Sequence, residues 1–381
     1  MNRQNNITRN ISKKTINNCL IVVMSTQYPG YGGSATNSYA IVKYLRKSGY
    51  NVHGIFVEDA QVDVDPDKLG CVYRIPRYMF FHNIKTSVTY HSSNLIRKFG
   101  RPPDLVLCKN YDTPYCSKLL FPTSKVVYMV SGLSNMIKLC KKIPANEVIK
   151  NNKTIEADEH DLQAVKCSNY VITNSKLTLD IMKKSMESYM SKIHPVPIDT
   201  SKYLITDNFT KIKSLPKIYD FIISASLLSR PEKNNVFLLK FIKLSEFSKY
   251  KKLIIGKDNK LFKTIPNSTV LDLVPNNEFV NYLGKSKVLL YPSLYDSNPN
   301  TVNEAILAGC LVLVSNNVGN YEKLPPEFVC TSYNVNEWKT KAHYLVQNYS
   351  QISNKNITVS NLKNNMNNSE LNNLIQDLIK L

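Results

Sequence analysis

The feature of this sequence that most constrains its fold is the alternation of short apolar runs with amphipathic segments. Residues 19–25 form an apolar run, a loop containing glycines follows, and residues 35–47 have the apolar spacing of a helix. Residues 52–57 form a second apolar run. Continuous apolar runs indicate strands buried on both faces, and the order strand–helix–strand indicates a parallel sheet covered by helices. The chain is therefore predicted to be an α/β protein.

The alternation continues along the chain in two series. The first predicts strands at 72–75, 104–108, 125–130, 170–173 and 192–196, with helices at 84–98, 156–167 and 177–187. The second predicts strands at 219–224, 252–255, 269–272, 288–291 and 311–314, with helices at 235–247, 276–285 and 300–308. A chain of 381 residues accommodates two doubly wound, Rossmann-like domains.

These series define the expected domains. Residues 18–200 form an N-terminal domain and residues 218–360 a C-terminal domain, and the polar, proline-containing segment 201–217 is the linker. Residues 1–17 read as a disordered basic arm. Apolar positions 371, 374, 375, 378 and 379 predict a helix within 361–381, for which packing on the N-terminal domain is one arrangement.

Composition narrows the classes of protein to consider. Lys and Arg number 49 against 29 Asp and Glu, a net charge of +20, which suits anionic substrates, acidic membranes or nucleic acid. The AT-rich codons of Lys, Asn and Ile explain the surplus equally well. No apolar run approaches the ~18 residues of a membrane span. The eight cysteines form no C-x-x-C pair and several lie in apolar runs, which indicates a reduced, cytoplasmic protein.

The loop after the first predicted strand contains Gly32 and Gly33. Glycines let a ligand approach the backbone closely, and the following helix offers free N–H groups to an anion. The spacing differs from the G-x-G-x-x-G dinucleotide motif. A tight structural turn and a ligand-binding loop both remain open for this segment.

The segment from Tyr291 to residue 314 carries the most specific pattern. A buried strand ends in Pro-Ser, a polar loop contains Asp296, a helix carries Glu304, and a glycine precedes another buried strand. Two carboxylates alone would fit an ordinary loop Asp and a surface Glu.

The whole pattern resembles the E-x7-E region of the family-4 retaining glycosyltransferases. These enzymes have the GT-B fold, in which two Rossmann-like domains face each other across a cleft. Asp296 stands where the first Glu usually stands, and the residues that match in order are Pro292, Ser293, Asp296, Glu304, Ala305 and Gly309. Further stretches resemble the family at 32–33, 174–175, 197–199, 231–234, 254–257 and 318–322, so that the resemblance covers about residues 19–325.

The resemblance implies a role for each matched residue. Lys233 and Arg230 would neutralise the donor diphosphate, and Asp296 would act with them as the catalytic group. Glu304 would accept hydrogen bonds from the ribose hydroxyls. The remaining donor-binding positions would be Gly32, Gly33, Gly256, Ser297, Asn298, Pro299, Asn300 and Thr301.

The expected function is the transfer of a sugar, with retention, from a nucleotide diphosphate sugar to an unidentified acceptor. A UDP- or GDP-sugar is the favoured donor, and the acceptor is a glycan, lipid or protein. We expect no metal or other cofactor and no nucleic-acid partner. A peripheral membrane contact is compatible with the basic charge.

Two departures from the family pattern keep alternatives open. The family Arg usually lies about five residues before the Lys, whereas Arg230 lies three before Lys233, and Ser131 stands where a histidine often follows a strand. A catalytically decayed basic binding protein therefore remains an alternative. A GT-B nucleotide-sugar epimerase is another, although it would need further acid and base residues in the N-terminal domain.

Two acidic patterns are interpreted as structural. Asp63 and Asp65 form a D-x-D pattern in an acidic loop and read as a solvated turn. Glu159, His160 and Asp161 are consecutive on a predicted helix, so their side chains fan around its axis and do not converge on a metal.

Overall fold

The structure is a computed structural model. It describes residues 19–26, 33–58, 72–76, 84–145, 147–148, 156–199, 209–354 and 369–380. The expected arm at 1–17, Gly32, the pair Asp63 and Asp65, and residues 201–208 of the expected linker lie outside the described residues.

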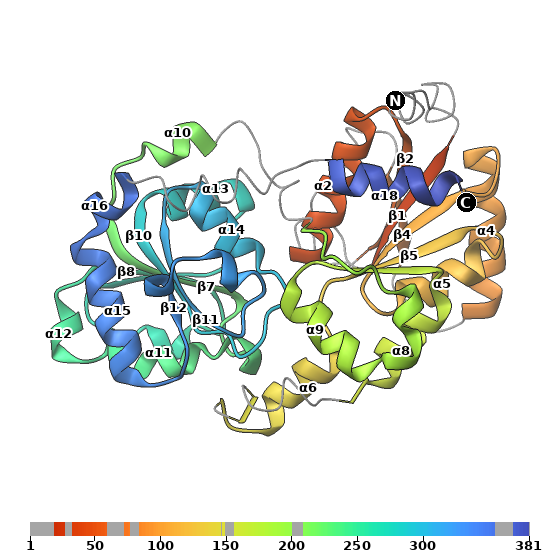
Figure 1. The fold of residues 1–381 in the computed structure, drawn as a ribbon. Coiled ribbons are helices and arrows are strands. Elements are labelled where there is room, and N and C mark those ends of the chain that lie inside the picture. The colour runs from red at the N-terminus through yellow and green to blue at the C-terminus, as the bar shows by residue number, and fades with distance from the viewer. Residues whose placement is uncertain are drawn as a thin grey trace, which may run out of the picture.

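The N-terminal half forms a six-stranded parallel sheet with the order β3-β2-β1-β4-β5-β6. Its strands are β1 (Leu20–Ser25), β2 (Asn51–Glu58), β3 (Val72–Pro76), β4 (Leu105–Lys109), β5 (Lys125–Val130) and β6 (Tyr170–Thr173). The helices around it are α2 (Gly33–Lys47), α4 (Ile84–Phe99), α5 (Thr113–Leu120), α6 (Ser134–Lys142), α8 (Glu159–Cys167) and α9 (Lys176–Ser185). This arrangement is the doubly wound domain that the first series predicts (Figure 1).

The C-terminal half repeats this architecture in the order β12-β11-β10-β7-β8-β9, again with all strands parallel. Its strands are β7 (Tyr219–Leu227), β8 (Lys252–Lys257), β9 (Ser268–Leu271), β10 (Ser286–Tyr291), β11 (Leu311–Ser315) and β12 (Val329–Cys330). Its helices are α10 (Phe209–Lys213), α11 (Asn235–Ile242), α12 (Ser245–Ser248), α13 (Asn276–Gly284), α14 (Asn300–Leu307), α15 (Val335–Gln347) and α16 (Tyr349–Asn354).

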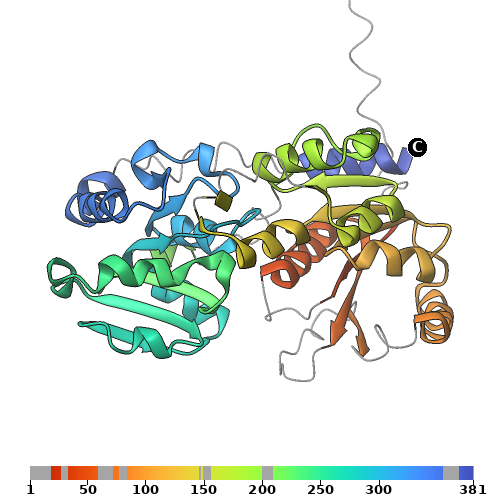
Figure 2. The ribbon, with the colours of Figure 1, turned by 90° about the horizontal axis from the view of Figure 1, so that it is seen from below.

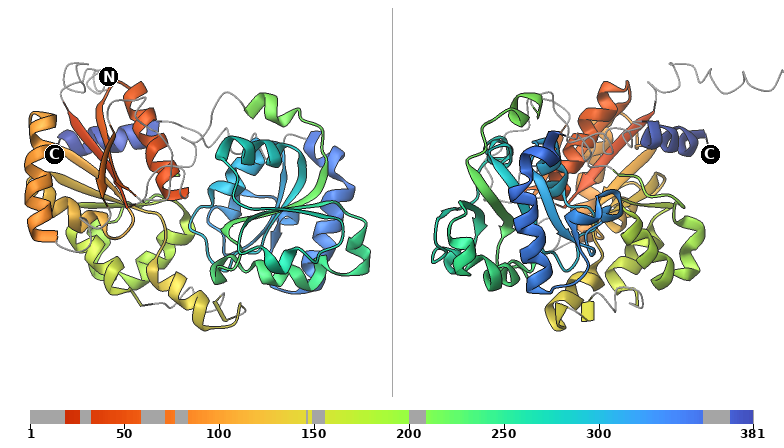
Figure 3. Two further views of the ribbon diagram at one scale, coloured as in Figure 1. Left: turned by 180° about the vertical axis from the view of Figure 1, so that it is seen from behind. Right: turned by 60° about the vertical axis from the view of Figure 1, so that its left-hand side comes forward.

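The two domains lie side by side, each with helices on both faces of its sheet (Figures 1, 2 and 3). Three of the strands are buried along their whole length, as their uninterrupted apolar sequences require: all residues of β1, β4 and β11 are buried. The two Rossmann-like domains expected from the sequence are confirmed.

Helix α18 (Ser369–Lys380) follows the C-terminal domain in sequence but packs on the N-terminal domain, beside α2 (Figures 1 and 3). Leu371, Ile375 and Leu378 belong to the same apolar cluster as Ile21 and Ile41. The helix thus completes the core of a domain far earlier in the sequence. No helix in the described parts of the chain is long and apolar enough to cross a membrane.

Two predicted elements differ in the structure. The predicted strand at 192–196 is wrong: a 3-10 helix occupies Glu187–Lys192, and Ile193 forms only an isolated bridge with Val171. Pro195 and Pro197 lack N–H donors, so the segment cannot extend a ladder. The predicted helix at 235–247 is divided into α11 and α12, because Leu244 has extended backbone angles between them.

Candidate functional site

A cavity of about 410 Å³ lies between the two domains and is lined by both. From the N-terminal domain come Lys109 at the end of β4, Ser131 after β5 and Asn174 after β6. From the C-terminal domain come the end of β7 and Tyr291 at the end of β10. Both sheets therefore present their carboxyl ends to the cavity, which is where ligands bind in open α/β sheets.

Most of the residues singled out from the sequence come together on the C-terminal wall of this cavity. They are Arg230, Lys233, Asp296, Ser297, Asn298, Pro299, Asn300 and Thr301. Gly256 and Glu304 are not in the lining, as far as the described residues define it. Gly33 begins α2, and its surroundings are not described.

Gly256 has a structural reason of its own to be glycine. Its φ is +149°, and a Cβ atom there would lie 2.0 Å from the backbone oxygen of Ala225. The close approach of β8 to the end of β7 therefore excludes any side chain at this position. Its role in donor binding stays a prediction.

Lys233 and Asp296 form an ion pair on the cavity wall. Tyr291 joins them: its hydroxyl donates to Oδ2 of Asp296 at 2.7 Å and accepts from Nζ of Lys233 at 2.9 Å. Burial alone would lower the pKa of Lys233, but the Asp296 carboxylate outweighs it and holds that pKa above its usual range. Lys233 is therefore a fixed positive charge at the carboxyl end of the sheet.

Arg230 also lines the cavity, and its guanidinium pairs with the carboxylate of Glu232. Glu232 is buried while Arg230 is partly exposed. Both belong to the tight turn that contains the 3-10 helix Pro231–Lys233, which ends at Asn234 in a left-handed conformation. This turn places the two cationic side chains on one wall.

The loop that carries Asp296 is also bonded to the N-terminal domain. Ser297 Oγ donates to the backbone oxygen of Ser131 at 2.5 Å, and Asn298 Nδ2 donates to Oδ1 of Asp199 at 2.6 Å. The backbone N–H of Leu133 donates to the hydroxyl of Tyr295 at 3.3 Å. One loop thus contributes to the cavity and fixes the contact between the domains.

Glu304 lies on the second turn of α14 and is only 6% exposed. Burial raises its pKa to about 7, and a hydrogen bond from the Asn276 side chain opposes this shift. A buried carboxyl group with few hydrogen bonds is suited to accept hydroxyl donors from a ligand. The assignment of ribose as the source of these donors stays a prediction.

Tyr291, Lys109 and Asn174 are among the lining residues that the sequence motifs did not assign to the site. Tyr291 immediately precedes Pro292 and ends a buried strand, a position that could have marked it as facing a ligand. Lys109 ends β4 in the same way and is 2% exposed, and burial lowers its pKa to about 8. Asn174 belongs to the stretch 174–175 that resembles the glycosyltransferase family, but that resemblance gave it no role in the site.

The acidic cluster on α8 is structural. Oδ2 of Asp161 accepts from the backbone N–H of Ser134 at 2.9 Å and so binds the start of α6. Within the ranges that the structure describes, no group of three His, Cys, Asp or Glu side chains could hold a metal ion.

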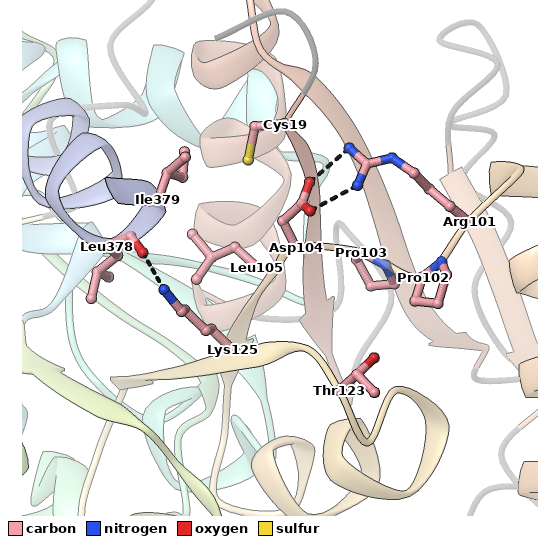
Figure 4. A pocket seen from close by; sticks show the side chains of 10 residues that line it. All are labelled: Cys19, Arg101, Pro102, Pro103, Asp104, Leu105, Thr123, Lys125, Leu378 and Ile379. Atoms are coloured by element: carbon pink, nitrogen blue, oxygen red, sulfur yellow. Dashed lines mark hydrogen bonds and ion pairs between the residues drawn. The ribbon is translucent and has the colours of Figure 1, made fainter. Parts of the chain in front are cut away.

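A second cavity, of about 830 Å³, lies at the opposite edge of the N-terminal sheet (Figure 4). It is lined at the amino ends of β1, β4 and β5 and by the end of α18. Its charged groups are paired with each other or with the backbone: Arg101 makes two bonds of 2.7 Å to Asp104, and Lys125 Nζ donates to the Leu378 oxygen at 2.8 Å. The end of α18 forms one wall of this cavity. We therefore look for the functional site in the smaller cavity between the domains.

Comparison with known proteins identifies the architecture. Starch synthase IV from Arabidopsis thaliana, bound to ADP and acarbose, superposes with a TM-score of 0.63 at 12% identity, over 95% of this chain and 98% of that one. Sucrose-phosphate synthase from Thermosynechococcus elongatus gives 0.65 at 14%, over 95% and 99%. A glycosyltransferase from Rickettsia africae gives 0.64 at 16%, over 95% and 97%.

The chain has the GT-B fold. No protein-family model matches the sequence, and no curated protein matches it significantly. At these identities the likeness establishes the GT-B fold alone, so the function has to be argued from the cavity.

Proposed function

We propose that the protein is a glycosyltransferase that moves a sugar, with retention, from a nucleotide diphosphate sugar to an acceptor. The observation that carries this proposal is the position of Lys233. It is a partly buried, positively charged lysine on the cavity wall, beside Arg230 and directly next to a carboxylate. Cations fixed where negative charge develops are the principal means of stabilising a departing diphosphate.

The reaction assigns a role to each wall of the cavity. The bond between the sugar C1 and the diphosphate breaks, and the developing negative charge is neutralised by Lys233 and Arg230. The positively polarised sugar is stabilised by Asp296. The acceptor hydroxyl attacks from the same face, and its proton passes to the departing diphosphate oxygen, so the configuration is retained. The loop 297–301 would hold the donor, and Glu304 the ribose.

The donor, the acceptor, the metal independence and the cellular location are proposed from structurally similar proteins and from the sequence. The starch synthase structure contains ADP, which supports a nucleoside diphosphate as the bound group. We propose a UDP- or GDP-sugar as donor, a metal-independent reaction, a cytoplasmic location, and a glycan, lipid or protein acceptor. Two buried cysteines, Cys108 and Cys310, are free thiols, which agrees with a reducing compartment.

The alternatives make different predictions for the same cavity. A decayed binding protein would bind a nucleotide or an anionic glycan without cleaving a nucleotide sugar. An epimerase would release an epimerised nucleotide sugar and would need acid and base groups on the N-terminal wall. Neither alternative explains the Lys233 and Asp296 pair better than transfer does.

The test is a thermal-shift screen against UDP, GDP, ADP and dTDP, followed by their sugars and by an assay of slow nucleotide-sugar hydrolysis. Lys233→Met should abolish the shift, whereas Lys243→Met, an exposed lysine of the same domain, should not. EDTA should leave the activity unchanged. A wild-type protein that neither binds nor cleaves any nucleotide sugar would refute the transferase proposal, and activity restored only by Mn²⁺ would refute metal independence.

A further inference from the structure

The hydroxyl of Tyr291 bonds to both charged groups of the cavity wall. It donates to Oδ2 of Asp296 at 2.7 Å and accepts a hydrogen bond from Lys233 at 2.9 Å. Tyr291 ends β10 and is only 5% exposed, so its ring is held by the core of the sheet. The hydroxyl is therefore a rigid point to which two longer, charged side chains are attached.

The carboxylate of Asp296 is fixed through both oxygens. Oδ2 accepts hydrogen bonds from Lys233 and from Tyr291, and Oδ1 accepts from the backbone N–H of Asn298 at 3.3 Å. Asp is one methylene shorter than Glu, so its carboxylate has a shorter reach and depends more on neighbours that come to it. Tyr291 is one such neighbour, and it carries no charge.

The ammonium group of Lys233 would have to bind both Asp296 and an incoming diphosphate. An ammonium group has three N–H donors, and the bonds to Asp296 and Tyr291 use two of them. A diphosphate arriving in the cavity carries more negative charge than one carboxylate and would draw the ammonium toward itself. If Lys233 moved without replacement, the carboxylate of Asp296, which is only 15% exposed, would lose its ion-pair partner, which is costly.

Tyr291 reduces that cost because its O–H still donates to Oδ2 of Asp296 when Lys233 turns away. We propose that Tyr291 is a positioning residue that allows Lys233 to be shared between Asp296 and the donor diphosphate. This inference rests on the proposed function, since it assumes that the cavity receives a diphosphate. It assigns Tyr291 no contact with the donor; the hydroxyl acts through Lys233 and Asp296.

The experiment is a double-mutant cycle measured by calorimetric binding of inorganic diphosphate, which requires no turnover. Tyr291→Phe should weaken diphosphate binding about tenfold, the size of one hydrogen bond to a charged group. Asp296→Asn should tighten it several-fold, because Lys233 loses its competing anion. In the Asp296→Asn background, adding Tyr291→Phe should change the affinity by less than about twofold, because the partner through which Tyr291 acts is gone.

The matched control is Tyr250→Phe. Tyr250 is also buried in the C-terminal domain, and its hydroxyl bonds to Nδ1 of His343 at 2.8 Å, away from the cavity lining. Its removal should lower thermal stability about as much as Tyr291→Phe without changing diphosphate affinity. If Tyr291→Phe fails to fold, Asp296→Asn alone decides: weaker diphosphate binding in that variant overturns the inference.

Other outcomes are equally decisive. An unchanged affinity in Tyr291→Phe, or the same fold-change in both backgrounds, overturns the inference. So does a wild-type protein that binds no diphosphate. The cycle can succeed while every nucleotide sugar remains uncleaved, and that result would refute the transferase proposal and leave the role of Tyr291 intact. With an active donor, Tyr291→Phe should reduce kcat as well as raise KM, whereas Tyr250→Phe should change neither.

Discussion

The pKa of Glu304 makes nucleotide binding depend on pH in a way that can be calculated. Burial raises this pKa to about 7 in the free protein. Two ribose hydroxyls can donate fully only to the ionised carboxylate, so a bound nucleotide favours the charged form. Binding should therefore release a proton near neutral pH, and affinity should rise as the pH rises through about 7.

The magnitude follows from the ionised fraction. At a pH equal to the pKa, half of the carboxyl groups are ionised, so the affinity is about half of its high-pH value. Each further pH unit below the pKa costs about 1.4 kcal/mol, or tenfold. Glu304→Gln removes the charge and the titration. Glutamine keeps one acceptor oxygen, so the variant loses about one charge-assisted bond of ~1.5–3 kcal/mol and should bind roughly ten- to a hundredfold more weakly at high pH. The titration due to Glu304 should disappear, and any pH dependence that remains belongs to other cavity groups such as Lys109, whose pKa is about 8.

Isothermal titration calorimetry with an intact nucleotide sugar is the appropriate assay, because its diphosphate has no terminal phosphate to titrate near neutral pH. Titrations between about pH 6 and about pH 8.5, in buffers of different ionisation enthalpy, give both the affinity and the number of protons released. Glu278→Gln is the matched control, since Glu278 is an exposed residue in the first turn of α13 in the same domain.

Equal affinity in wild type and Glu304→Gln would refute the ribose assignment. A wild-type affinity that is independent of pH, with no proton release, would contradict the raised pKa. Weaker binding in both Glu304→Gln and Glu278→Gln would show that the effect is not specific to the buried carboxylate.

Three further predictions concern stability and packing. Burial raises the pKa of Asp161 to about 6 from 3.8, so the native state disfavours its ionised form. The free energy of unfolding, measured with urea, should therefore fall by up to about 3 kcal/mol as the pH rises from about 4 to about 6. The Asp161→Asn variant should not show this loss. Gly319→Ala places a Cβ 1.8 Å from the Ser297 oxygen, so it should displace the cavity loop, cost about 1–3 kcal/mol and weaken nucleotide binding; an unchanged nucleotide titration would contradict this. Ile375→Ala should cost about 2–5 kcal/mol of stability, measured by thermal unfolding, whereas Asn373→Ala on the exposed face of α18 should cost little.

The two parallel sheets could be anticipated because several strands are uninterrupted apolar runs, and such runs are typical of parallel sheets buried on both faces. The segment at 192–196 contains the β-branched residues Ile193 and Val196, which favour a strand, but Pro195 between them has no N–H to donate to a ladder. Helix α5 was not predicted because it is short and has Pro114 in its first turn; proline breaks a helical interior but is tolerated there.

The cavity could be predicted only in part. The motif around Asp296 indicated the C-terminal wall, because its residues are close in sequence as well as in space. Lys109, Asn174 and Tyr291 come from separate strand ends, and only the packing of the two domains brings them together. The burial of Glu304 likewise depends on its tertiary surroundings, which include the Asn276 side chain of α13, a contact that no local pattern records.

The return of α18 to the N-terminal domain has a consequence for how the protein is made. Ribosomes release the chain from its N-terminus onward, and domains generally begin to fold as they emerge. Here Leu371 and Ile375 complete the core around Ile21 and Ile41, yet they are synthesised only after the whole C-terminal domain. The apolar surface that α18 covers in the N-terminal domain therefore stays exposed until the C-terminal domain has been synthesised. Such a surface is a natural substrate for a chaperone, and a ribosome stalled before codon 371 would leave it permanently exposed.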